Sequence, residues 1–175
     1  MNRSAHLVLR GTPIGDLILV RRGEALSAVY MQEHRHRPEY STFGPLEHYA
    51  DSADRVLGAA VRQLGEYFNG VRTRFDLALD PVGTPFQHRV WERLRAIPYG
   101  ATRSYGQLAR ELGSPGSSRA VGMANGRNPL SIVVPCHRVI GANGAMTGFG
   151  GGLERKVWLL ELERRQVVAG SAMPS

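Results

Sequence analysis

A six-residue stretch rich in proline and glycine divides the chain and limits how it can fold. The run Asp80-Pro81-Val82-Gly83-Thr84-Pro85 interrupts both helical and strand periodicity, because proline cannot donate a backbone hydrogen bond. The segments on either side are each long enough for a small domain. We therefore predict a domain over 1–80, a linker over 81–85, a second domain over 86–166 and a flexible tail over 167–175.

The two segments differ sharply in charge. Residues 1–80 hold ten arginines and ten acidic side chains, whereas residues 86–138 hold eight arginines and two glutamates, a net charge of +6. Concentrated arginine is typical of surfaces that bind a phosphate backbone. A basic face that is merely solvated would show the same excess, so charge alone leaves both interpretations open.

The first segment predicts an antiparallel meander followed by a helix. Alternating apolar residues over 5–10, 16–21 and 24–31 indicate three strands, with glycine-containing turns between them. Helical spacing predicts a helix over 53–68, and alternation over 75–79 predicts a further strand. His34 and His36 lie in a polar stretch without a third metal ligand, so we interpret them as loop residues and predict no metal site.

The second segment predicts short helices arranged as a helix-turn-helix. Apolar spacing places a helix over 86–97, and Ser104-Tyr105-Gly106-Gln107 is a capping box that opens a helix ending near 112. A third helix over about 117–125 follows, with Ala120, Val121 and Ala124 on its inner face. The last helix is expected over 153–165. No aliphatic run approaches the roughly 20 residues of a membrane span, so we expect a soluble, intracellular protein without membrane partners.

Cys136 is the only cysteine, which excludes an internal disulfide and a multi-cysteine zinc site. It follows an apolar segment, residues 130–139, that we expect to be extended. The neighbouring His137 and Arg138 are cationic groups that would favour a reactive thiolate. A buried structural thiol is the alternative.

The run Pro135-Cys136-His137-Arg138-Val139 resembles the active-site signature of the O6-alkylguanine-DNA alkyltransferases. Further matches follow the same order along residues 86–165. They are Ser104-Tyr105-Gly106-Gln107-Leu108-Ala109, Arg119-Ala120-Val121-Gly122, Asn128-Pro129 and Gly150-Gly151-Gly152-Leu153. The resemblance implies an α/β (α+β) protein. A small antiparallel sheet with a helix, in a ribonuclease H-like layout, would precede a mostly helical, winged helix-turn-helix-like domain that carries the cysteine.

The same resemblance implies direct-reversal DNA repair. The protein would flip O6-alkylguanine, and as a second candidate O4-alkylthymine, out of double-stranded DNA and transfer the alkyl group irreversibly to Cys136. It would be a single-turnover methylated-DNA–protein-cysteine methyltransferase without cofactor or metal. We expect a monomer, with cooperative assembly on DNA left open. We also expect a cytoplasmic location, at the nucleoid in a bacterium or in the nucleus of a eukaryote.

The resemblance also assigns roles to individual residues. His137 would act as a base through water, held by Glu163, while Tyr105 would rotate the nucleotide and donate to guanine N3. Arg119 would fill the vacated space in the base stack, and Asn128 would brace the turn before the active-site segment. The remaining DNA-binding residues are Ala120, Gly122 and Asn125. The substrate pocket comprises Val134, Pro135, Val139, Phe149, Gly150 and Lys156.

Simpler interpretations remain for several of these residues. Tyr105 could be a core aromatic, Arg119 one more phosphate contact, and Glu163 a surface partner of Arg164. Phe149 stands where most relatives carry a tyrosine, which removes one hydroxyl near O6. Competing functions are a non-catalytic damage-binding or regulatory DNA module, whose relatives lack the cysteine, and a thiol hydrolase. The hydrolase requires a direct Cys-His hydrogen bond, which adjacent residues on a strand cannot make.

Overall fold

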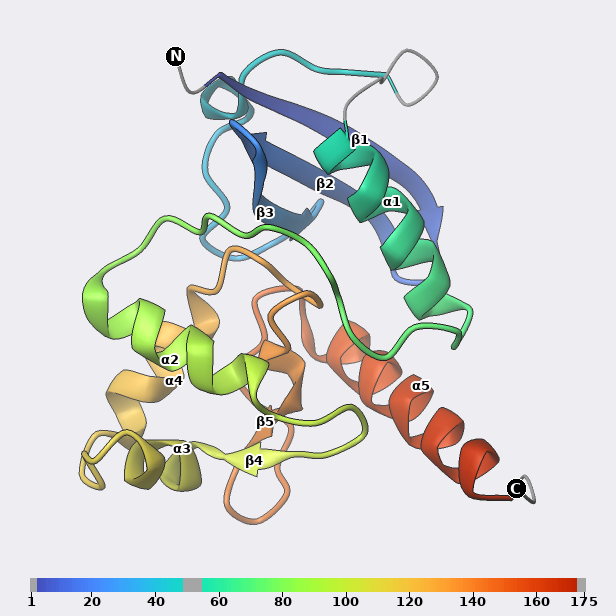
Figure 1. The fold of residues 1–175 in the computed structure, drawn as a ribbon. Helices are drawn as coiled ribbons and strands as arrows, with labels where there is room; N and C mark the ends of the chain where they lie inside the picture. Colours follow the sequence, from blue (N-terminus) through green and yellow to red (C-terminus); the bar gives the residue numbers. More distant parts are fainter. Residues whose placement is uncertain (1–2, 49–54, 173–175) are drawn as a thin grey trace. The chain divides into compact units, whose positions relative to one another are not determined.

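The computed structural model describes residues 3–48 and 55–172, which form two compact units divided between Val82 and Gly83. The first unit contains a three-stranded sheet in the order β1-β2-β3 (Figure 1). Its strands are β1 (Ser4–Thr12), β2 (Gly15–Arg22) and β3 (Ala25–Met31), paired antiparallel. The expected meander is therefore confirmed.

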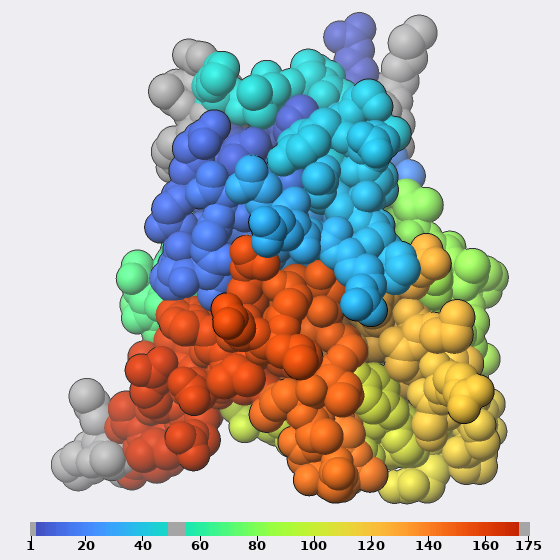
Figure 2. All heavy atoms as spheres, turned by 180° about the vertical axis from the view of Figure 1, so that it is seen from behind, coloured from blue at the N-terminus to red at the C-terminus, as the bar shows by residue number. Residues whose placement is uncertain are grey.

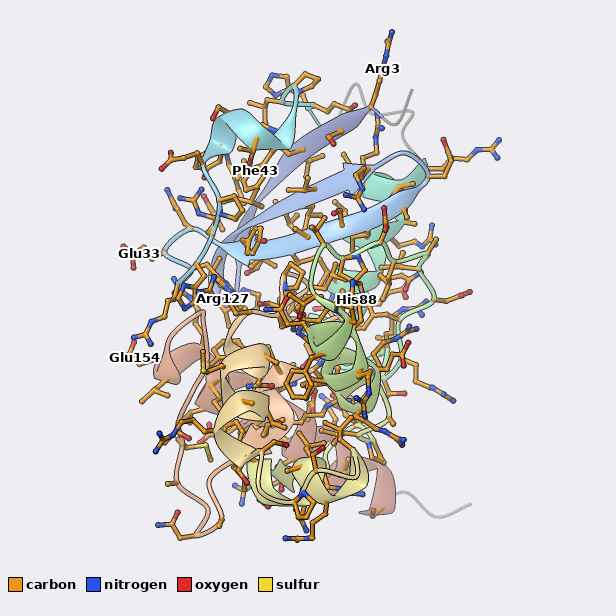
Figure 3. All side chains as sticks on the ribbon, turned by 90° about the vertical axis from the view of Figure 1, so that its left-hand side faces the viewer. Arg3, Glu33, Phe43, His88, Arg127 and Glu154 are labelled. Atoms are coloured by element: carbon orange, nitrogen blue, oxygen red, sulfur yellow. The ribbon has the colours of Figure 1, made fainter. Side chains whose placement is uncertain are left out.

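Both faces of this sheet are buried, which explains the continuous apolar run Leu17-Ile18-Leu19-Val20 in β2. Helix α1 (Arg55–Phe68) lies across one face (Figure 1). The short 3-10 helix η1 (Tyr40–Phe43) places Phe43, labelled in Figure 3, in the core cluster on Ile18, Val20, Ala28 and Tyr30. The first two residues of the helix expected over 53–68 lie outside the described residues.

The strand expected over 75–79 does not form. This segment is extended, but only Leu79 makes a bridge, in parallel with Leu26, through Leu26 N to Ala78 O and Asp80 N to Leu26 O, each 2.9 Å. The Asp80 carboxylate also accepts from Arg22 Nε at 2.8 Å. Alternation alone predicted a strand, whereas pairing with β3 is limited to this single point.

The second unit begins with α2 (Pro85–Arg95), β4 (Arg103–Ser104), α3 (Tyr105–Glu111) and α4 (Ser118–Gly126). The capping box predicted at Ser104 is confirmed, because its hydroxyl accepts from Gln107 N and the Gln107 side chain accepts from Ser104 N. Thr84 and Gln87 form a second capping box that sequence analysis missed. Helix α4 packs against α2 and α3, and Trp91 Nε1 donates to Ala124 O at 2.9 Å.

The rest of the second unit comprises the 3-10 turn η3 (Cys136–Arg138), β5 (Val139–Ile140) and α5 (Leu153–Ala172). Strand β5 pairs in parallel with β4, so that Ser104 lies opposite Ile140. This small sheet beside α3 and α4 confirms the expected α+β class with a helical second part. Among the residues that the structure describes, no helix is long and apolar enough to cross a membrane.

Helix α5 differs from its prediction in length. It continues through Val167 and Val168 to Ala172, beyond the expected end at 165, because no proline or glycine occurs between Arg165 and Ala169. Its buried residues are Lys156, Leu159, Leu162 and Glu163. Two of these four side chains are ionisable, and hydrophobic spacing does not count charged residues that face the interior.

Candidate active site

Cys136 lies on a tightly folded turn and not on the extended segment that we expected. Val134 N donates to Leu130 O at 2.8 Å, Val133 N to Ser131 O at 2.9 Å and Cys136 N to Val134 O at 2.8 Å. The last two bonds each span two residues and define γ-turns. Ile132, at the centre of the first, has a φ of 72°, which is strained for a β-branched residue. The chain is thereby bent so that the cysteine faces the interior.

Asn128 holds this turn from the end of α4. Its Nδ2 donates to Val134 O at 2.8 Å, and its Oδ1 accepts from Leu130 N at 3.0 Å. The side chain is 2% exposed, so these bonds form away from water. Because a buried amide left without partners would cost about 1–3 kcal/mol, this position strongly favours asparagine.

The surroundings of Cys136 favour the neutral thiol. Burial raises its pKa, and hydrogen bonding from Asn128 and the charge of Lys156 oppose that effect only in part. Neither His137 nor Arg138, which we expected to favour the thiolate, is among the groups that lower the pKa of the thiol. Their charged or polar ends turn toward Glu163 instead, and the thiol needs a base to become a nucleophile.

His137, Arg138 and Glu163 form a buried cluster between η3 and α5. Glu163 Oε1 accepts from His137 Nε2 at 2.8 Å and from Arg138 Nη2 at 2.8 Å, and Oε2 accepts from Arg138 Nε at 2.9 Å. The side chains of His137 and Glu163 are fully buried. Burial tends to raise the pKa of Glu163, but these partners outweigh it and hold that pKa well below its usual range. Glu163 is thus a buried carboxylate and not a surface partner of Arg164.

Tyr105, the first residue of α3, lies between α4 and the loop that follows β5. Its hydroxyl donates to Thr147 O at 3.1 Å. A Cβ at Gly148 would lie 2.4 Å from the Tyr105 hydroxyl oxygen, and one at Gly122 would lie 3.6 Å from the ring. Burial and the nearby Cys136 both raise the pKa of Tyr105. Two glycines therefore leave room for a phenol that is half-buried beside the thiol.

Lys156 secures the same loop from α5. Its Nζ donates to the carbonyl oxygens of Val139 and Thr147, and burial lowers its pKa to about 8. In Figure 2 the surface of the loop, in orange, lies between that of α5, in red, and that of α3 and α4, in yellow. Of the expected pocket residues, Val134, Pro135, Val139 and Phe149 are buried and Gly150 is half-buried.

Helix α4 presents an exposed face that includes Arg119, Ala120 and Met123, with Gly122 partly exposed. Two expectations for this helix are wrong. Ala120 lies outside and not on the inner face, and Asn125 is 1% exposed, so it is not available to DNA. Asn125 Nδ2 instead points toward Gly148 O at 3.3 Å and Cys136 O at 3.4 Å. Arg127 caps the helix and extends from its end (Figure 3).

Sequence reasoning missed two residues of the site. Arg138 contributes to the cluster around Glu163, although its place in the five-residue signature was a signal that could have been used. Ser131 is fully buried and lowers the pKa of the Cys136 thiol, and no sequence pattern indicated it. No group of three metal-binding side chains converges among the described residues.

Fold and site together define a helix-turn-helix protein in which a buried thiol lies beside a histidine–glutamate pair. Residues 85–165 match the family model for the 6-O-methylguanine DNA methyltransferase DNA binding domain, and residues 9–81 match its ribonuclease-like domain. The chain belongs to the 6-O-methylguanine DNA methyltransferase family.

Similar proteins cover nearly the whole chain. It is 53% identical to the methylated-DNA–protein-cysteine methyltransferase of Mycolicibacterium paratuberculosis, over 88% of this chain and 89% of that protein. The Salmonella typhimurium protein of the same name is 47% identical, over 87% and 91%. The crystal structure of Mycobacterium tuberculosis OGT in complex with DNA matches with a TM-score of 0.82 at 46% identity, covering 93% of this chain and 94% of that one.

Proposed function

We propose that this protein repairs DNA by moving an alkyl group from O6 of guanine to the sulfur of Cys136. The observation that carries the proposal is the buried thiol held beside the His137–Glu163 pair, directly after the helix-turn-helix, in a chain whose relatives are named for this reaction. Double-stranded DNA is the proposed partner, and the net charge of +6 over 86–138 suits its phosphates.

In the first step, α3 and α4 contact the duplex and the damaged nucleotide rotates out of the stack. Unstacking costs a few kcal/mol. Arg119, exposed near the start of α4, would occupy the vacated space and so offset part of that cost. Tyr105 lies one helix away and would contact the rotated nucleotide. No base-specific reading is required, because the lesion is recognised after extrusion.

In the second step, Cys136 becomes a thiolate. His137 donates from Nε2 to Glu163, and its Nδ1 is buried without a hydrogen bond to any residue that the structure describes. This nitrogen would take the thiol proton, with one water as the relay. The resulting imidazolium is stabilised by Glu163, which follows the orienting principle of other activated nucleophiles.

In the third step, the sulfur attacks the alkyl carbon, an S–C bond forms and the C–O6 bond breaks. The guanine leaves with the electron pair, and Tyr105 would stabilise the developing charge by donating to N3. Protonation of the guanine anion then restores the ordinary base. The thioether on Cys136 has no return path, so each molecule reacts once without a cofactor.

Four further assignments accompany this function. We propose that residues 86–166 carry DNA binding and transfer while residues 1–80 support them, and that the protein acts as a monomer in the cytoplasm, at bacterial nucleoids. The location follows from the location of its DNA substrate.

Phe149 in place of a tyrosine would remove one hydrogen bond to O6 and so change the rate or the range of alkyl groups.

Stoichiometry tests the proposal. Duplex DNA carrying O6-methylguanine is titrated with protein, and the remaining lesion is quantified after complete reaction. We expect one lesion lost for each protein molecule and then no further reaction, with Cys136→Ser inactive. Continued turnover would contradict a single-use thiol, and DNA binding without lesion loss would instead favour a damage-binding module.

A further inference from the structure

The buried cluster around Glu163 contains one charged group that the proposed reaction does not use. Arg138 donates to both oxygens of Glu163, from Nη2 at 2.8 Å and from Nε at 2.9 Å, and its Nη1 donates to Ile97 O at 2.7 Å. Its side chain is 8% exposed. Because a guanidinium remains charged at all ordinary pH values, the negative charge of Glu163 already has a permanent partner.

This partner determines the charge that His137 can carry. A buried imidazolium would be a second cation beside one carboxylate, and Lys156 lies near as a third basic group. An uncompensated buried charge is costly. The histidine is therefore held neutral while the carboxylate remains ionised.

The same arrangement determines which ring nitrogen carries the proton. An ionised carboxylate only accepts hydrogen bonds, so the 2.8 Å contact from His137 Nε2 to Glu163 requires a proton on Nε2. In a neutral ring Nδ1 then has the lone pair. Gly100 N also donates to Glu163 Oε2 at 3.1 Å, so the orientation of the carboxylate is fixed from three sides.

We propose that Arg138 is a positioning residue for the proposed alkyl transfer: by binding both oxygens of Glu163 it keeps His137 neutral, with its proton on Nε2 and its Nδ1 free to accept the thiol proton. The role that we assign to Arg138 rests on the proposed function. The protonation state of the His137 ring does not, and it can be measured without the reaction.

The titratable and charged groups around the ring come from every element beside it. They are Glu163 and Lys156 on α5, and Cys136 and Arg138 on η3. Tyr99, from the turn after α2, lies against the guanidinium at 5.6 Å. Burial lowers the pKa of His137, Glu163 works to raise it, and Arg138 and Lys156 lower it further. Removing Arg138 therefore raises the pKa of His137 toward that of a salt-bridged imidazolium.

Nitrogen NMR of the unaltered protein, with labelled histidine, tests the ring state directly. The spectrum at pH 7 is expected to show His137 with a protonated Nε2 and an unprotonated Nδ1, with His137→Gln identifying its signals. A proton on Nδ1, or on both nitrogens, would overturn the proposal. This measurement requires neither substrate nor a buried substitution, so it stands even if an Arg138 variant does not fold.

The pH dependence of alkyl transfer distinguishes a positioning role of Arg138 from a purely structural one. In Arg138→Gln the inflection of the rate should move upward by about one pH unit, and at pH values below the original inflection the rate should fall roughly tenfold, since there each unit changes the neutral fraction about tenfold. At high pH the rates should converge. Arg138→Lys keeps the charge and should retain the original inflection, and the exposed Arg164→Gln should match the unaltered protein.

Two outcomes distinguish the possible failures. A uniformly lower rate with an unmoved inflection in Arg138→Gln would make Arg138 a structural residue only and overturn the inference. Absence of transfer by the unaltered protein at every pH would remove the proposed function, and the NMR result would then decide the ring state alone.

Discussion

At Tyr105 the hydroxyl that the proposed reaction needs is already engaged within the protein. It donates to Thr147 O at 3.1 Å, on a loop that Lys156 also holds. The bond must open before the phenol can donate to the extruded guanine. The loop carbonyl therefore keeps the phenol near the thiol before DNA arrives, at the cost of one exchangeable hydrogen bond.

Replacing Tyr105 with phenylalanine should separate the contribution of the hydroxyl donor from that of the aromatic ring. We expect Tyr105→Phe to slow single-turnover methyl transfer by roughly tenfold to several hundredfold, because removing one donor to a developing anion costs about 2–4 kcal/mol at most. Binding to undamaged duplex, measured by fluorescence anisotropy, should stay unchanged. A variant that transfers at the original rate would show that Tyr105 is only a core aromatic.

Helix α4 combines small residues with one arginine, which suits binding to a duplex from which a base has been rotated. Gly122 lies beside the Tyr105 ring, while Arg119 and Ala120 are exposed at the start of the helix. A helix with a small, exposed face can approach a groove closely, and its arginine can enter the space left by a rotated base.

The role of Arg119 can be tested by comparing duplex with single-stranded substrate. Arg119→Ala should reduce transfer from a duplex by roughly tenfold to a hundredfold, since support for an extruded base that costs a few kcal/mol is lost. Transfer from the same single-stranded oligonucleotide should change little, because no stacked partner is displaced.

The exposed Arg110 on α3 provides the matched control. Arg110→Ala should weaken binding to both substrates modestly and equally, as expected for loss of a phosphate contact. If Arg119→Ala behaved in the same way, the extrusion role would be contradicted and Arg119 would be one more phosphate contact.

At the level of elements, local signals predicted the fold well where hydrogen bonds are local. The capping box at Ser104 and the three strands of the meander formed as expected. The valine-rich segment before Cys136 did not, because its conformation is set by Asn128 and by two γ-turns, and periodicity contains no information about either. Periodicity likewise contains no information about the charged residues on the buried face of α5.

The site could be predicted only in part for a related reason. A five-residue signature identified the nucleophile and its neighbours, and resemblance indicated the companions on α5. The convergence of Ile97, Arg138 and Glu163 depends on how three distant segments pack. No spacing in the sequence encodes that contact, so the state of the thiol and the part played by Arg138 became visible only in three dimensions.

For the whole molecule, charge and chemistry are concentrated in the second unit. The first 80 residues are electrically neutral, whereas 86–138 carry a net +6 together with the nucleophile. Binding is therefore expected to depend on the phosphate backbone and to weaken as salt rises. Chemistry then depends on the sulfur of a single cysteine residue that is 3% exposed, which an alkyl group can reach only from an extruded nucleotide.

The most direct test of this account is the mass of the protein after reaction. The protein is mixed with an excess of duplex carrying one O6-methylguanine, and intact mass and peptide maps are recorded beside Cys136→Ser. We predict a gain of one methylene per molecule, located on the peptide containing Cys136 and absent from the variant. An unchanged mass despite DNA binding, or a methyl group on any other residue, would contradict the account.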